Sequence, residues 1–127
     1  GAGFVVLLGG SIVGAGLSFD CPGLPLCDDR SPTDAAWLHA IHRTAAVLLL
    51  AALIATAVRL RKRRGTVLAI GLNHGAAFLV LMQIGVGVSA VVQTLPDGLR
   101  VLHLAIATLI WWAIVAQWAL ALKVRSV

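Results

Sequence analysis

The side chains of this chain that are best suited to chemistry are four histidines and two cysteines. Two of the histidines, His39 and His42, lie in WLHAIHRTAAVLLL (37–50), where Arg43 follows directly, and His103 lies in LHLAIATL. Each of these segments leads into a long apolar run. An imidazole can bind a metal or transfer a proton near neutral pH. Which of these it does here depends on the solvent around it, and therefore on the elements that position it.

The composition indicates a membrane protein. Of the 127 residues, 60% are hydrophobic and 12% are charged, whereas about 25% of residues are charged in soluble domains. Four apolar stretches cover residues 2–18, 34–60, 66–92 and 97–122 approximately, and the last three exceed the ~20 residues of a spanning helix. We predict an all-α integral membrane protein with one domain, 1–127, that forms an up-and-down four-helix transmembrane bundle. A signal peptide is the alternative for the first stretch, but a basic segment before the apolar residues is missing.

The charges predict the orientation of the helices. Seven of the ten Lys and Arg residues follow the second and fourth stretches, whereas all five acids are Asp residues at the opposite ends. Basic loops face the cytoplasm, so we expect a multi-pass protein of the cell membrane with both termini cytoplasmic and the loop 19–33 outside. The net charge of +5 then reflects topology and contact with membrane lipid, and we expect no nucleic-acid partner.

Two histidines are expected at nearly the same depth. His42 is eight residues into the second stretch and His103 six residues into the fourth, or ~12 and ~9 Å from the outer edge at 1.5 Å per residue. Both helices run inward, so the two rings can offer axial ligands to one haem iron. Ala45, Ala46 and Ala107 follow at helical spacing and leave room for a macrocycle. Zinc is disfavoured, because the thiols lie in a loop.

Other polar residues surround this pair. Arg43 and Arg100 can bind haem propionates, with snorkelling to the interface as the alternative. His39, one turn outward of His42, can assist a propionate, relay protons or lie in the polar interface. His74 lies about 18 Å from the outer edge by the same rise, too deep for the same iron, so we expect a neighbouring helix to satisfy it, with Asn73 as a further polar group.

The glycines of the apolar stretches give two further expectations. Gly71-x-x-x-Gly75 and the earlier Gly10-x-x-x-Gly14 predict close helix packing. Gly85 and Gly87 remove side chains from one region and leave room for a flat ligand or a helix.

The loop CPGLPLC places Cys21 and Cys27 on the oxidising side of the membrane, where we expect a disulfide. Whether this pair is redox-active or only a staple stays open, since the spacing is not that of a CxxC motif.

These motifs together resemble the haem A synthases of cytochrome oxidase assembly. The segments that support this resemblance are, in sequence order, CPGLPLC, IHRTAA, LMQIGVGVSAVVQTLP and LHLAIATL. Leu24 stands where the family loop usually has Trp. Full-length members resemble two such four-helix halves, so the resemblance implies that His42 and His103 are haem ligands, with haem b as cofactor. It also implies haem o as substrate, whose methyl group is oxidised to the formyl of haem a, and a possible partner in haem o synthase.

The resemblance bears on catalysis as well. The catalytic half of the family carries a Glu three residues before the His-Arg pair, suspected of assisting the oxidation, and His39 occupies that position here. His39 is therefore our candidate catalytic residue. Because the chain has no Glu, it is more similar to the haem b-binding half, or to a half-length member that forms a homo-oligomer or joins a second four-helix half.

Three alternatives from other classes stay open. A b-type cytochrome would use the same His42 and His103 for electron transfer without modifying haem. A membrane thiol-disulfide oxidoreductase would use Cys21 and Cys27, although such proteins generally need a second cysteine pair. In a haem-free assembly subunit, the histidines would be incidental polar residues.

Overall fold

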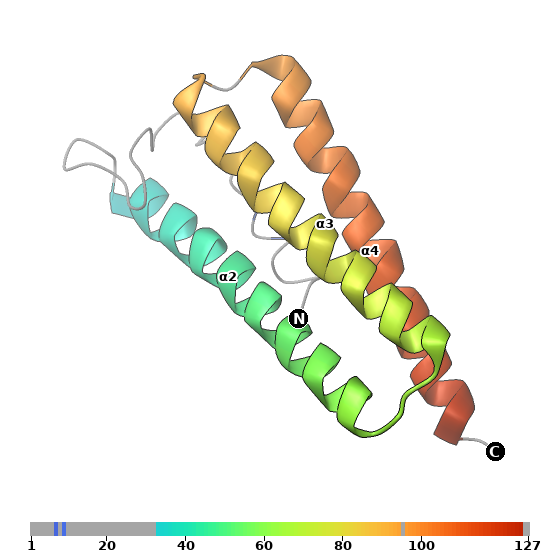
Figure 1. Ribbon diagram of the computed structural model, residues 1–127. Helices are drawn as coiled ribbons and strands as arrows, with labels where there is room; N and C mark the ends of the chain where they lie inside the picture. Colours follow the sequence, from blue (N-terminus) through green and yellow to red (C-terminus); the bar gives the residue numbers. More distant parts are fainter. Residues whose placement is uncertain (1–6, 8, 10–32, 95, 126–127) are drawn as a thin grey trace.

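Three long helices make up the described part of the chain. Figure 1 shows the computed structural model, in which residues 7, 9, 33–94 and 96–125 are described. The helices are α2 (Thr33–Lys62), α3 (Val67–Val92) and α4 (Asp97–Arg125). They match the predicted stretches 34–60, 66–92 and 97–122 closely. The predicted helix 2–18, except for Leu7 and Gly9, and the whole cysteine loop lie outside the described residues.

All three helices are candidates for crossing a membrane. The segments Ala36–Lys62, Val67–Val92 and Asp97–Lys123 are long and apolar enough to span it. Most of their large apolar side chains are exposed, among them Trp37, Phe78 and Trp118. Such exposure would be unfavourable in water and suits helices whose outer surfaces face lipid. The expectation of an all-α, multi-pass membrane protein is confirmed to this extent.

Short turns hold the helices in antiparallel order. After α2, the Gly65 N–H donates to the Leu60 carbonyl (2.8 Å), and the hydroxyl of Thr66 then accepts from the N–H of Ala69 (3.2 Å) as the N-cap of α3. Pro96 immediately precedes α4, and its carbonyl accepts from the Arg100 N–H (3.2 Å). These connections are short, so consecutive helices must run in opposite directions.

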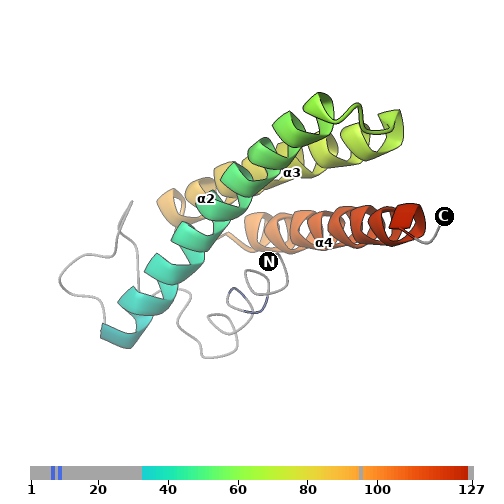
Figure 2. The ribbon, with the colours of Figure 1, turned by 90° about the horizontal axis from the view of Figure 1, so that it is seen from below.

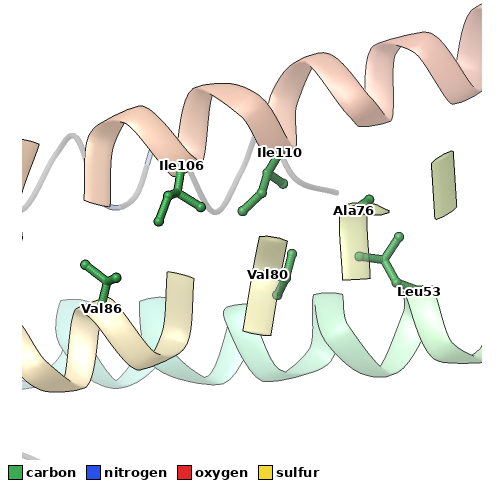
Figure 3. Close-up of a cluster of buried hydrophobic side chains, with 6 residues drawn as sticks. All are labelled: Leu53, Ala76, Val80, Val86, Ile106 and Ile110. Carbon is green, nitrogen blue, oxygen red and sulfur yellow. The ribbon is translucent and has the colours of Figure 1, made fainter. Parts of the chain in front are cut away.

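The core of the described region lies along α3. This helix packs against both α2 and α4, and the view in Figure 2, from below, shows the three helices from a second side. Figure 3 shows the buried apolar side chains, which come from all three helices: Leu53, Ala76, Val80, Val86, Ile106 and Ile110. The core is small because side chains facing lipid need no protein cover.

The basic residues gather at one end of the molecule. The C-terminal ends of α2 and α4 lie at the same end (Figures 1 and 2). Arg59, Arg61 and Lys62 occupy the last turn of α2, and Lys123 and Arg125 lie in the last turn of α4. This arrangement is the one that the predicted topology requires, and we refer below to this end as the basic end and to the opposite end as the acidic end.

Candidate metal centre

The helices place His42 and His103 at nearly the same depth. His42 is nine residues from the start of α2 at Thr33, and His103 is six residues from the start of α4 at Asp97. At 1.5 Å per residue, the two residues lie about 14 and 9 Å from the acidic ends of their helices, a difference of less than one turn. The described structure thus places two imidazoles at comparable heights on two helices that run in the same direction (Figure 1).

Each of these rings lies against a glycine. A Cβ atom at Gly9 would lie 3.1 Å from Cε1 of His42, and one at Gly87 would lie 3.3 Å from Cε1 of His103. Any larger residue would therefore press on the ring, because such distances are shorter than ordinary contacts. Gly85, by contrast, has open space at this position. Of the two glycines expected to leave room, Gly87 lies against the His103 ring, and Gly85 has no described side chain beside it.

His103 and Gln83 are partly buried and lie beside each other. The side chain of Gln83 on α3 donates through Nε2 to the main-chain carbonyl of His103 (2.9 Å). Nδ1 of His103 and Oε1 of Gln83 are both buried, and neither has a hydrogen-bond partner in the described part of the chain. Nδ1 of His42 is buried as well. A buried polar atom without a protein partner is uncommon and calls for an explanation.

Of the other predicted site residues, His39 and Arg100 lie nearer the acidic end than the two histidines, and Arg43 directly follows His42. His39, three residues before His42, is buried, and Arg43 is partly buried; both interact with other groups of the chain. Nη1 of Arg100 lies 3.3 Å from Oδ1 of Asp97, one turn earlier on α4. The side chain of Arg100 stays 39% exposed in this ion pair, so it retains donors for a second anion. Cys21 and Cys27 lie outside the described residues.

His74 has a separate environment near the basic end. Its Nδ1 lies 2.7 Å from the Ile70 carbonyl, and its Nε2 lies 3.2 Å from Nη2 of Arg61. A carbonyl only accepts and a guanidinium only donates, so these contacts assign the proton to Nδ1. A side chain from α2 thus satisfies this imidazole, as expected. Asn73 makes a separate bond, from Nδ2 to the Leu53 carbonyl of α2 (2.9 Å).

The Gly71-x-x-x-Gly75 motif does not mediate packing within the described chain. A Cβ atom at either glycine would meet nothing within 4 Å. The expectation of close packing through this motif is wrong for the described helices, because α2 and α4 pack against other faces of α3. Its counterpart at Gly10 and Gly14 lies outside the described residues.

The donor set fits a haem iron better than a zinc ion. Among residues 33–94 and 96–125, together with Leu7 and Gly9, no three His, Cys, Asp or Glu side chains gather as metal ligands. Structural zinc sites usually have four protein ligands and catalytic ones three, whereas a haem iron takes its equatorial ligands from the macrocycle and needs only axial ones. Two partly buried imidazoles, each beside a glycine that a larger residue could not replace freely, are compatible with that requirement.

Sequence reasoning overlooked Gly9 and Gln83. Gly9 lies in a glycine-rich stretch that predicts only helix packing. Gln83 carried a usable signal: it is a polar residue in the middle of an apolar span, one helical turn before Gly87, and polar residues within a membrane are by default candidates for function.

Comparison with known proteins agrees with these observations. A family model described as cytochrome oxidase assembly protein, COX15-CtaA, matches residues 3–115. No curated protein matches the chain significantly. The family match covers most of the 127 residues and includes α2, α3 and most of α4. The chain therefore belongs to the COX15-CtaA cytochrome oxidase assembly family, whose members are haem A synthases.

Proposed function

We propose that this chain is a membrane haemoprotein of haem A synthesis, which holds haem b between α2 and α4 through His42 and His103. The observation that supports this proposal is that two imidazoles lie at nearly one depth on α2 and α4, each against a glycine. A bis-histidine site needs ligands from two facing helices at matching height. The family membership agrees with haem as the ligand.

The side chains around the pair have distinct proposed roles. His42 and His103 supply axial nitrogens, and the glycines beside them keep the rings from being displaced. Arg43 and Arg100 lie toward the acidic end, where guanidinium groups would bind the propionates and hold the macrocycle in one orientation. The bound haem would supply the redox chemistry, as cofactors generally do.

His39 is the proposed proton-transfer residue. It is buried, and its position three residues before His42 puts it near the same face of α2. An imidazole can accept or return a proton near neutral pH. On this proposal, His39 would move a proton during oxidation of the haem o methyl group to the formyl of haem a, in the place that the family's catalytic half gives to Glu.

A second candidate function is electron transfer without haem modification. The chain contains no Glu, and in the family a Glu is the suspected catalytic residue at the His39 position. A b-type cytochrome, or a haem b-binding half that passes electrons to a catalytic partner, would need only His42 and His103. The partner would then be a second four-helix half or another copy of this chain, and the basic end would face the cytoplasm.

Identification of the pigment tests the proposal directly. The protein is purified from a host that makes haem o, and its pigment is analysed by the pyridine haemochrome spectrum and by mass spectrometry. Haem b together with haem a or a hydroxylated haem o supports haem A synthesis. Haem b alone supports the electron-carrying alternative. Protein without haem would overturn the site.

A further inference from the structure

We propose that Gln83 is the positioning residue of His103, and that its Oε1 accepts a hydrogen bond from Nδ1 of that ring when Nε2 binds iron. This inference rests on the proposed function, since it concerns the ligand state of His103. It assigns a role to a residue on α3, the helix that supplies neither of the two proposed iron ligands. Gln83 would act through His103 and would not touch the iron.

The contact between Gln83 and the main chain of His103 fixes the orientation of the amide. The atom 2.9 Å from the His103 carbonyl oxygen is Nε2, and only the NH₂ group can bond a carbonyl, because a carbonyl oxygen donates nothing. The other amide atom is therefore the acceptor Oε1, held beside the same residue. Oε1 is buried and has no donor in the described part of the chain.

The His103 ring presents its Nδ1 side to the same face of α3. A Cβ atom at Gly87 would lie 3.3 Å from Cε1 and 3.7 Å from Nδ1 of His103. Gln83 precedes Gly87 by four residues, so the two positions share one face of the helix. Nδ1 is also buried without a partner among the described residues. Two complementary buried atoms, Oε1 of Gln83 and the Nδ1 that faces Gly87, thus lie along one strip of α3.

Metal binding gives a reason for the two atoms to join. A histidine that binds a metal through one nitrogen carries its proton on the other, and this N–H is nearly always donated to an acceptor that fixes the tautomer and the ring orientation. The acceptor also makes the ring a stronger electron donor to the metal. Without ligation, the neutral ring is free to hold its proton on either nitrogen, and the pairing with Oε1 is not required.

The chain offers a matched control for loss of this residue. Gln117 on α4 donates through Nε2 to the Leu72 carbonyl of α3 (3.5 Å). It therefore also joins α3 to α4 by a side-chain to main-chain bond, but fourteen residues beyond His103, or about 21 Å along the helix. Gln117→Leu tests whether a lost bond between these helices is enough to change the haem site.

The experiment compares Gln83→Leu, Gln83→Glu and Gln117→Leu with the wild type as purified full chains. Haem affinity is measured by titration of haem into the protein, and the midpoint potential of the bound haem is measured by spectroscopic redox titration. We expect Gln83→Leu to raise the haem dissociation constant about tenfold, the lower end of the range for lost second-sphere bonds, and to shift the potential upward. Gln83→Glu keeps an acceptor oxygen, so its affinity should stay near wild type and its potential should not rise.

Each outcome decides the inference. Unchanged affinity and potential in Gln83→Leu would overturn it, as would an equal change in Gln117→Leu, which would mean that helix packing alone is responsible. Equal behaviour of Gln83→Glu and Gln83→Leu would show that the amide donor matters and the acceptor does not, which also contradicts it. A wild-type chain that binds no haem would refute the proposed function itself, whereas the other results refute only the role of Gln83.

Discussion

The acidic and basic halves of the described bundle treat their histidines differently. Near the basic end, both nitrogens of His74 are used by the chain itself, one by the Ile70 carbonyl and the other by Arg61. Near the acidic end, His103 is partly buried, and its buried Nδ1 lacks a partner among the described residues. On α3, the residue that lies against this ring is Gly87, which has no side chain.

This difference separates a structural histidine from a ligand candidate. A polar group within a membrane is costly unless something satisfies it. His74 is satisfied by its own chain, and its environment is complete without a ligand. Nδ1 of His103 has no such partner among the described residues, and the glycine beside the ring keeps side-chain atoms out of the adjacent space. His74 is also exposed, whereas His103 is partly buried.

The largest effect should come from removal of the paired imidazoles. We expect His42→Ala and His103→Ala each to abolish the low-spin haem absorbance of the purified protein, because neither helix offers another imidazole at that depth within the described residues. His74→Ala is the matched control, since it removes the same side chain from the other half of the bundle. Its spectrum should equal that of wild type. An unchanged spectrum in either of the first two variants would refute the ligand assignment.

A steric change at Gly87 should have the next largest effect. Gly87→Val places a branched side chain where even a Cβ atom would be 3.3 Å from the His103 ring. Overpacking of this kind costs about 1–3 kcal/mol, which corresponds to a haem affinity reduced roughly fivefold to 140-fold if the cost falls on the bound state. Gly85→Val makes the same change two residues earlier, where space is open, and should bind haem normally. Titration of haem into both variants checks this, and equal affinities would show that the glycine has no role at the ring.

Loss of Asn73 should affect stability and leave the haem unchanged. Asn73 is fully buried and joins α3 to the Leu53 carbonyl of α2. Hydrogen bonds between membrane helices contribute about 0.6 kcal/mol on average and up to about 1.7, so Asn73→Ala should lower the free energy of unfolding by an amount of this order. Unfolding in mixed micelles measures it, with the exposed Gln93→Ala as control. If a folded Asn73→Ala protein lost its haem spectrum, the haem site in the acidic half of the bundle would depend on packing in the basic half.

The sequence predicts the three described helices well because their signals are strong. Each is an apolar run longer than a bilayer requires, and each is bounded by charged or turn-forming residues such as the Arg-rich loop and Pro96. The nearly equal depth of His42 and His103 also follows from counting residues, once the ends of the helices are known. These features depend on one helix at a time.

Features that depend on contacts between helices could not be predicted in the same way. Whether Gly71, Gly85 or Gly87 faces a neighbour depends on the rotation of α3 about its axis, and its nearly continuous apolar sequence gives little information on that rotation. For the same reason, the contact of Gln83 with His103 and that of Arg61 with His74 appear only in the structure. The roles of His39, Arg43 and Arg100 toward a ligand stay predictions.

The smallest predicted effect concerns the acidic end, where Arg100 is paired with Asp97 (3.3 Å). An exposed pair of this kind contributes little to stability, so neither Arg100→Gln nor Asp97→Asn should change unfolding measurably. If Arg100 also holds a propionate, its loss removes a positive charge beside the haem and should lower the midpoint potential, whereas Asp97→Asn removes a negative charge and should leave the potential equal or slightly higher. Redox titration of the two variants shows whether Arg100 binds a propionate or lies only in the membrane interface. Equal potentials in both would assign Arg100 to the interface alone and would leave Arg43 as the remaining arginine proposed to bind a propionate.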